Sequence, residues 1–452
     1  MGRTSSALLA LSLCLCFCST SWAQDTKAGL REVYGAAEGA YGRISEDGFV
    51  GLTLKGQLKW GIPLPGFDEL GTLRVAAIVP LRLRVQDEPP LQGTGLRQRD
   101  WDAPTDALRV LRYAGVVSHD RTFEVAVGDI GPLDLGHGTL VFHHYNNTAL
   151  DVYHMGALFK VLTDTWSVHG MISDVFDPGV MAARVSRAAL VPELVVGASV
   201  VADRSAPETL KLDDDPGAYL AADDTGRPIP DQTSTQLWLG ADMQWSFIKS
   251  GASSLTQYVD VNWHTDVGAG VHVGVDFGFE SQPLVMTQKL EVNFSAGGYL
   301  PRYIGPLYDV DRVWFAQWGQ RRPAPKLAFA RTQEQTFRAG FMAQNRTIWA
   351  GLLDMELVYA QRADEPQTAL MLGRVGLHLR DVLHVGGFVA RHGATNIFTK
   401  RDALISSEAV LNVTDFLYVT GQYGVRWELN EVGGYEPASY SWLGLGARLV
   451  LR

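Results

Sequence analysis

Large apolar residues hold every odd position from Val271 to Phe279, and small or polar residues hold most of the even ones. A strand with this period of two has one apolar face and one polar face. Similar alternation recurs along most of the chain, for example in segments 122–129, 237–247, 258–264 and 417–429. The sequence therefore predicts an all-β protein whose many strands each bury or cover one apolar face.

The first residues have the features of a cleaved secretory signal peptide. Arg3 precedes a short apolar run, and Ser21 and Ala23 supply the small residues that a signal peptidase reads. The run is shorter than the ~20 continuous apolar residues that a membrane-spanning helix needs. All three cysteines lie in this leader, so we expect an exported chain without disulfides or a Cys-ligated metal. We predict a signal peptide over residues 1–23 and one β-domain over 24–452.

Composition narrows the class of protein further. The chain carries a formal charge of −10, which argues against a nucleic-acid partner. Its mean hydropathy is close to zero, which excludes both a helical membrane protein and a disordered chain. The 47 glycines and the aromatic content of 10% fit a β-rich chain with many turns.

Two architectures can use one-sided strands: a soluble β-protein with a dry core, or a barrel with an apolar outside and a polar lumen. The polar face favours the barrel, because it is rich in Gly, Ser, Asn and Gln and holds few charges. Aromatic residues that suit interfacial girdles stand toward strand ends, at Trp60, Trp245, Phe247, Trp263, Tyr299, Trp427 and Trp442. We predict a single transmembrane antiparallel up-and-down β-barrel of roughly 16–20 strands, each with the ~9–11 residues that cross a bilayer. In the alternative, a soluble periplasmic β-protein, the same aromatics fill a core.

The carboxyl end carries the most direct likeness to a known group of proteins. Gly446 is followed by apolar Leu449 and Leu451 at the third and fifth positions after it, with Leu451 in place of the usual aromatic and Arg452 behind it. With the strand pattern from Val33 onward, this end resembles the final strand of Gram-negative outer-membrane β-barrels, porin-like ones in particular, without pointing to a subfamily. Segment 135–140 with 145–147 is also similar to a stretch of uncharacterised barrels of this kind. The resemblance implies an outer-membrane location, contact with outer-membrane lipid and recognition by the barrel-assembly machinery.

Function has to be sought on the polar face and in the long connections. If the barrel is open, its lumen would be shaped by inward polar residues. The candidate pore-lining residues are Asp260, Asn262, His264, His272, Asp276, Gln422, Arg426 and Glu428. A connection over residues 300–326 could form a constriction where guanidinium groups and aromatic faces bind solutes, or it could pack on the barrel rim. Its candidate residues are Arg302, Trp314, Trp318, Arg321 and Arg322.

The connection over residues 203–232 is acidic, with runs at Asp213–Asp215 and Asp223–Asp224. Clustered carboxylates can bind Ca²⁺, but the regular spacing of a defined site is absent, so a solvated loop is the favoured interpretation. Whether this connection binds cations is left open.

No catalytic or metal-binding motif stands out, and we predict neither an enzyme nor a cofactor. His143 and His144 are neighbours on the chain, and adjacent strand residues point to opposite faces. We predict an outer-membrane channel for the passive or weakly selective passage of small polar solutes. The rival is a barrel plugged by its own loops that serves as a surface receptor, adhesin or assembly scaffold. Self-association into a homo-oligomer is left open.

Overall fold

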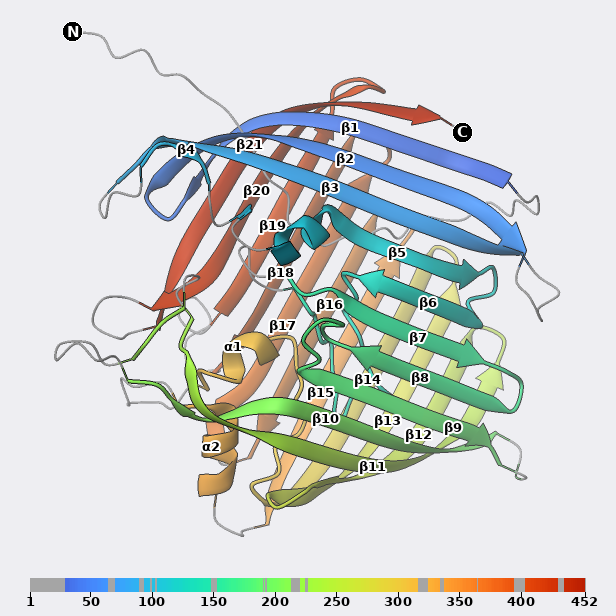
Figure 1. Cartoon of the computed structure of the whole chain (residues 1–452). Coiled ribbons are helices and arrows are strands. Elements are labelled where there is room, and N and C mark those ends of the chain that lie inside the picture. The colour runs from blue at the N-terminus through green and yellow to red at the C-terminus, as the bar shows by residue number, and fades with distance from the viewer. Residues whose placement is uncertain are drawn as a thin grey trace, which may run out of the picture.

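The alternating segments form the wall of a closed antiparallel β-barrel in the computed structural model of the chain (Figure 1). The structure describes residues 29–451 except for stretches at 64–69, 89–92, 98–99, 102–103, 148–152, 190, 192, 213–219, 224–226, 316–323, 334–336, 364, 394–402 and 430–434. The signal peptide predicted at residues 1–23 lies outside the described residues and stays a prediction.

The strands of the first half are β1 (Gly29–Ile44), β2 (Asp47–Pro63), β3 (Leu70–Gln86), β4 (Gly95–Leu96), β5 (Leu111–Ser118), β6 (Phe123–Gly128), β7 (Gly156–Leu162), β8 (Trp166–Ile172), β9 (Val180–Ala188), β10 (Leu194–Leu210) and β11 (Pro230–Ser250). Those of the second half are β12 (Ser253–His264), β13 (Gly268–Ser281), β14 (Leu284–Gly297), β15 (Arg338–Trp349), β16 (Leu353–Arg362), β17 (Glu365–Leu379), β18 (Leu383–His392), β19 (Ala403–Asn412), β20 (Leu417–Leu429) and β21 (Tyr435–Leu451). Several exceed the predicted ~9–11 residues, and the longest, β11, has 21.

Each wall strand pairs with its sequence neighbours, and the ring closes where β1 pairs with β21. The two-residue β4 pairs only with β3, which continues the ring through β5. The wall therefore has 20 strands, which confirms the predicted all-β barrel and its strand range.

The two faces of the wall follow the sequence alternation. On β13, Val271 and Val275 are 37% and 38% exposed, whereas His272 between them is fully buried inside the barrel. Their neighbours Val273, Phe277 and Phe279 are half-buried and none belongs to the buried core. On the last strand, Leu449 and Leu451 point outward and are 63% and 54% exposed. The apolar faces thus point out toward lipid, as predicted.

The predicted aromatic girdle is confirmed for some members and wrong for others. Trp60, Trp245, Phe247 and Trp263 are exposed on the outside. Tyr299 and Trp442 are buried within the barrel instead. Trp442 lies against Gly42 of β1, where an added Cβ would approach its ring to 1.6 Å, so the glycine makes room for an inward indole. The side chain of Trp427 lies outside the described residues.

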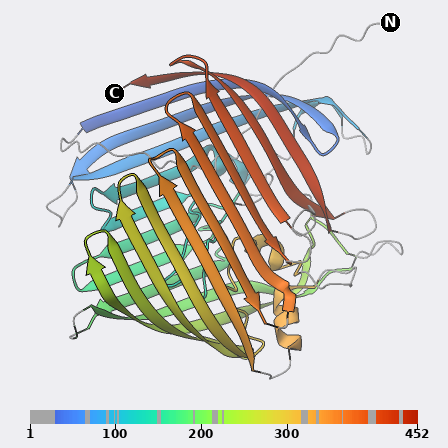
Figure 2. The ribbon, with the colours of Figure 1, turned by 180° about the vertical axis from the view of Figure 1, so that it is seen from behind.

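Connection length separates the two ends of the barrel. Turns such as 119–122, 251–252, 282–283 and 380–382 lie at the end that also holds Gly29 and Leu451 (Figure 2). The long connections between β3 and β5, β6 and β7, β10 and β11, and β14 and β15 start from the other end. Because outer-membrane barrels have short periplasmic turns and long outer loops, we assign the first end to the periplasm.

Among the residues that the structure describes, helical structure lies in the long connections. A 3₁₀ turn (Pro104–Val110) lies between β4 and β5, and the short helices α1 (Tyr308–Asp311) and α2 (Lys326–Thr332) lie between β14 and β15. Among the described residues, no helix has the length and apolar character to cross a membrane.

Candidate functional site: the barrel lumen

Two long connections turn back into the barrel and pair with each other there. Residues 129–147, between β6 and β7, contact residues 298–315, between β14 and β15, through a parallel bridge of Val141 with Ile304. The Phe142 amide donates to the Ile304 carbonyl over 2.9 Å, and the Arg302 amide donates to the Thr139 carbonyl over 2.8 Å. We call residues 129–147 and 298–315 together the inner plug (Figure 1).

The inner plug has an apolar core of its own. Leu140, Val141, Tyr299 and Ile304 are nearly fully buried, and they pack with Trp238 of the wall strand β11. Burying apolar surface contributes roughly 25 cal/mol per Å², so a cluster of this kind holds the two segments together in the lumen. The plug is therefore a packed element rather than a pair of loose loops.

The turn of residues 135–138 depends on two glycines. Gly136 and Gly138 have φ angles of 60° and 69°, in the left-handed region that side chains disfavour. A Cβ on Gly136 would also lie 2.8 Å from Nε of Arg184, and one on Gly138 would lie 2.9 Å from the Phe142 ring. The turn lets His137 stack on the Tyr258 ring of β12 at a centroid distance of 4.0 Å.

Polar residues of the wall anchor the plug where we expected a pore lining. Thr139 Oγ1 donates to Asp260 Oδ2 over 2.5 Å and accepts from Asn262 Nδ2 over 3.1 Å. Arg302 Nη2 donates to Glu291 Oε1 over 2.5 Å, and His272 Nδ1 lies 2.8 Å from the same oxygen. Asp260, Asn262 and His272 thus lie under the plug, and each is at most 5% exposed.

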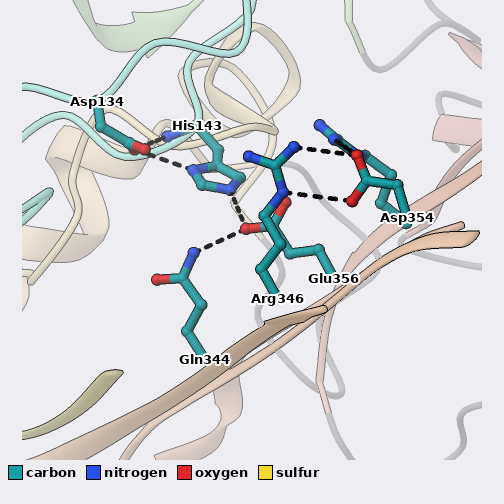
Figure 3. Close-up of polar contacts among 7 residues, drawn as sticks. Asp134, His143, Gln344, Arg346, Asp354 and Glu356 are labelled. Carbon is teal, nitrogen blue, oxygen red and sulfur yellow. Dashed lines mark hydrogen bonds and ion pairs between the residues drawn. The ribbon is translucent and has the colours of Figure 1, made fainter. Parts of the chain in front are cut away.

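His143 forms a second anchor between the plug and the wall (Figure 3). Its Nδ1 lies 2.9 Å from Asp134 Oδ1 within the plug, and its Nε2 lies 2.8 Å from Glu356 Oε1 on β16. Gln344 of β15 also donates to this Glu356 oxygen over 2.7 Å. His143 has a φ of 46°, and the bond from its amide to Asp134 Oδ1 at 2.6 Å helps to hold that unusual backbone.

The charge of His143 follows from these neighbours. Burial by itself would lower the pKa of the imidazole, but the carboxylates of Asp134 and Glu356 outweigh burial and raise it to about 9. A doubly protonated ring donates to both carboxylates at once. The anchor is therefore a cation held between two anions at neutral pH.

A third anchor involves the start of the acidic connection. Asp203 is fully buried inside the barrel, where it accepts from the Tyr308 hydroxyl and lies 3.4 Å from Arg312 Nη2. Strands β10 and β11 extend to Leu210 and Pro230, so the free connection covers 211–229 and is shorter than the 203–232 expected from the sequence. Asp213–Asp215 lie outside the described residues.

The other candidate residues are placed as follows. His264 faces inward and stacks on Trp238, and Asp276 faces the lumen 3.9 Å from His137 Nδ1. Gln422 donates to Glu408 over 3.2 Å. Arg426 and Glu428 pair with Ala438 and Glu436 in the wall, and their side chains lie outside the described residues.

Trp314 is half-buried beside α1, and Trp318, Arg321 and Arg322 lie outside the described residues. A role for these residues in a pore or constriction stays a prediction.

A cavity of about 530 Å³ lies between the plug and the wall strands β2, β3 and β5–β8. Its charged and polar lining was not predicted from the sequence, and it includes Gln57, Arg74, Arg112, Glu124, Asp129, Asn147, Lys160 and His169. Strands β6 and β7 supply Glu124 and Lys160, which face each other in register. The alternation of Phe123, Val125 and Val127 places Glu124 on the polar face. No local sequence feature indicates that the plug leaves this part of the wall uncovered.

The cavity is lined by cations and anions that lie close to each other. Arg112 Nη1 of β5 lies 3.4 Å from Asp129 Oδ2 of the plug, and Lys160 stands opposite Glu124 on the wall. In the described part of the chain, no group of three or more His, Cys, Asp and Glu side chains is arranged to hold a metal ion. The charged side chains of the lining are groups that make hydrogen bonds and electrostatic contacts.

A closed antiparallel barrel with an apolar outer face and a polar interior defines the class of outer-membrane β-barrel proteins. No protein-family model matches the sequence, and no curated protein has significant sequence similarity to it.

Several solved structures of outer-membrane proteins from Pseudomonas aeruginosa have weak structural similarity to this chain. The outer membrane protein opdK aligns over 93% of this chain and 99% of its own with 9% identity and a TM-score of 0.36, and it has also been solved with vanillate. OccK8 (OprE) aligns over 94% of this chain and 98% of its own with 12% identity and a TM-score of 0.35. The class of this chain rests on its own strand pairing and on the two faces of its wall.

Proposed function

We propose that this protein is an outer-membrane channel for the passive or weakly selective passage of small polar solutes. The observation that carries the proposal is the cavity of about 530 Å³ beside the inner plug. Sites for small molecules commonly occupy ~300–1,000 Å³, so the cavity has room for a small hydrated solute. Charged groups in its lining would contact a polar solute, since Arg74, Arg112 and Lys160 stand on the wall and Asp129 stands on the plug.

The plug supports the idea of selectivity. It is held inside the lumen by contacts such as those of Thr139 with Asp260 of β12 and of His143 with Glu356 of β16. A solute therefore has to pass close to charged groups on the opposite side of the lumen. Passage would depend on solute size and charge rather than on size alone.

The test is electrical. The full chain, purified in detergent and folded, is inserted into planar lipid bilayers under an applied voltage. A channel gives steady current steps at constant voltage. If protein with the heat-dependent gel mobility of a folded barrel gives no current, the proposal is overturned.

One observation favours the plugged alternative, a surface receptor, adhesin or assembly scaffold without transport. The plug buries its own apolar core against Trp238 and Met171 of the wall, as expected for a permanent part of the fold. In that case the folded barrel carries no current. Loosening the plug by His143→Ala would then open a conductance that the parent protein lacks.

Export by the leader is a separate proposal. Signal peptidase should remove residues 1–23, so the mature chain would begin at Gln24. Amino-terminal sequencing of protein from an outer-membrane fraction tests this. A first residue other than Gln24 would rule out the proposed cleavage position.

A further inference from the structure

Two histidines face each other inside the barrel, next to a short turn at the end that holds the termini. His378 on β17 and His384 on β18 are direct cross-strand partners. Their Nδ1 atoms lie 3.0 Å apart, and their ring centroids lie 4.5 Å apart with an interplanar angle of 46°. The pair lies outside the inner plug and does not line the cavity of the proposed channel.

Each ring of the pair has a glycine beside it. A Cβ on Gly376 would lie 3.3 Å from His378 Nε2, and one on Gly386 would lie 3.6 Å from His384 Nε2. Both rings therefore turn their Nε2 atoms toward the neighbouring glycine and their Nδ1 atoms toward each other. Solvent reaches the site, because the side chain of His384 is 25% exposed.

A carboxylate lies behind one of the two rings. Glu408 Oε1 on β19 is 3.7 Å from His384 Nε2, and the Glu408 side chain is 22% exposed. A carboxylate at this position favours the tautomer with hydrogen on Nε2, which leaves the Nδ1 lone pair available. Metal-binding histidines usually have such a carboxylate partner on the ring nitrogen that does not bind the metal.

We propose that His378 and His384 bind one borderline divalent cation, of the class of Zn²⁺, Ni²⁺ or Cu²⁺, through their Nδ1 atoms. Imidazole nitrogen suits these ions. Two nitrogens at ~2.0–2.1 Å from a tetrahedral Zn²⁺ stand about 3.3 Å apart, so the observed 3.0 Å needs only a small adjustment. Water completes the coordination shell, and Glu408 orients His384.

The proton balance is simple for the neutral pair. Without metal, one ring carries its hydrogen on Nδ1 and donates it to the other Nδ1. Metal binding moves that hydrogen to Nε2 of the same ring, so both Nδ1 lone pairs face the ion and no net proton is released. The site does not depend on whether the barrel conducts.

The test is calorimetric titration of Zn²⁺ into the folded full chain, made without a polyhistidine tag. We expect one Zn²⁺ per chain, and we expect His378→Ala and His384→Asn each to weaken binding by about tenfold or more. Asn at position 384 keeps an amide that can bond His378 but is a poor zinc ligand. The matched control is His119→Ala, which removes an exposed single histidine from a turn at the same end and should leave binding unchanged.

Absence of Zn²⁺ binding by the parent protein would overturn the proposal, as would equal binding by the parent and both variants. A second measurement avoids any folding defect of the variants. In the parent protein, Zn²⁺ should protect His378 and His384, but not His119, from modification by diethylpyrocarbonate. Equal modification of all three with and without Zn²⁺ would also overturn the proposal.

Discussion

His143 Nε2 lies 2.8 Å from Glu356 Oε1, although 213 residues separate them along the chain. This contact joins a loop that leaves the outer end of the barrel to a wall strand on the far side of the lumen. It fixes how the plug divides the interior. The plug contacts β12 through Thr139 and β16 through His143, and the cavity lies between the plug and the strands β2, β3 and β5–β8.

Removing His143 should loosen the plug. In His143→Ala, the buried carboxylate of Glu356 loses one of its hydrogen-bond donors, which should cost about 1–3 kcal/mol of stability. Urea unfolding of the protein in lipid vesicles measures this cost. Limited proteolysis should also cut residues 129–147 faster than in the parent protein. His119→Ala is the control, and equal stability and equal cleavage in both variants would show that the anchor does not hold the plug.

The same anchor should depend on pH. The pKa of His143 is about 9 in the folded protein and near 6.5 for a free histidine, so its stabilisation is complete below about pH 6.5. It is lost as the pH rises through about 9, and it amounts to at most roughly 3 kcal/mol. The difference in unfolding free energy between the parent protein and His143→Gln should therefore shrink from pH 6 to pH 10. A difference that stays constant over that range would contradict the charged state of His143.

Charge in the cavity should set ion selectivity. Lys160→Glu replaces a cation on the cavity wall with an anion, opposite the existing Glu124. The reversal potential in a salt gradient should then shift toward cation selectivity, because the local potential in the passage becomes more negative. The control is Lys249→Glu, on a side chain that is 62% exposed near a short turn. An identical shift in both variants would mean that the cavity is not the conducting path.

The outward face of β13 should be intolerant of charge. Val275→Lys places a cation on the lipid-facing side, at a cost of roughly 2–4 kcal/mol if the position lies near the bilayer midplane. Thr256→Lys is the matched inward change, since Thr256 stands in register with Asp276 and a lysine there gains an anion. Folding yield into lipid vesicles should fall for the first variant and stay close to the parent level for the second. Equal yields for the two variants would mean that Val275 does not contact lipid.

The wall of the barrel could be predicted from the sequence because its signal is local. Neighbouring residues such as Val271 and His272 lie on opposite faces because side chains alternate along a strand. The pairing of neighbouring strands follows from the short turns between them. The short strands β7 and β8, with seven residues each, gave weaker patterns. The strand range was nevertheless correct.

The plug could not be predicted, because its contacts join residues far apart in the chain. Thr139 donates a hydrogen bond to Asp260, which is 121 residues away along the chain, and no feature of either segment predicts this contact. For this reason, Asp260, Asn262 and His272 were correctly placed on the inner face, but the loop that covers them was not foreseen. The aromatic residues show the same limit, since Trp442 turns inward over Gly42 of another strand, and Tyr299 belongs to the plug and packs over Gly270.

The seam between β1 and β21 also bears on how the molecule can be made. Val33 pairs with Leu451, so the first wall strand finds one of its two partners only when the last one arrives. Until then, two strands have unpaired backbone groups that lipid cannot satisfy. An open sheet would be a costly species in the bilayer, and closure of the ring between β1 and β21 should therefore accompany insertion.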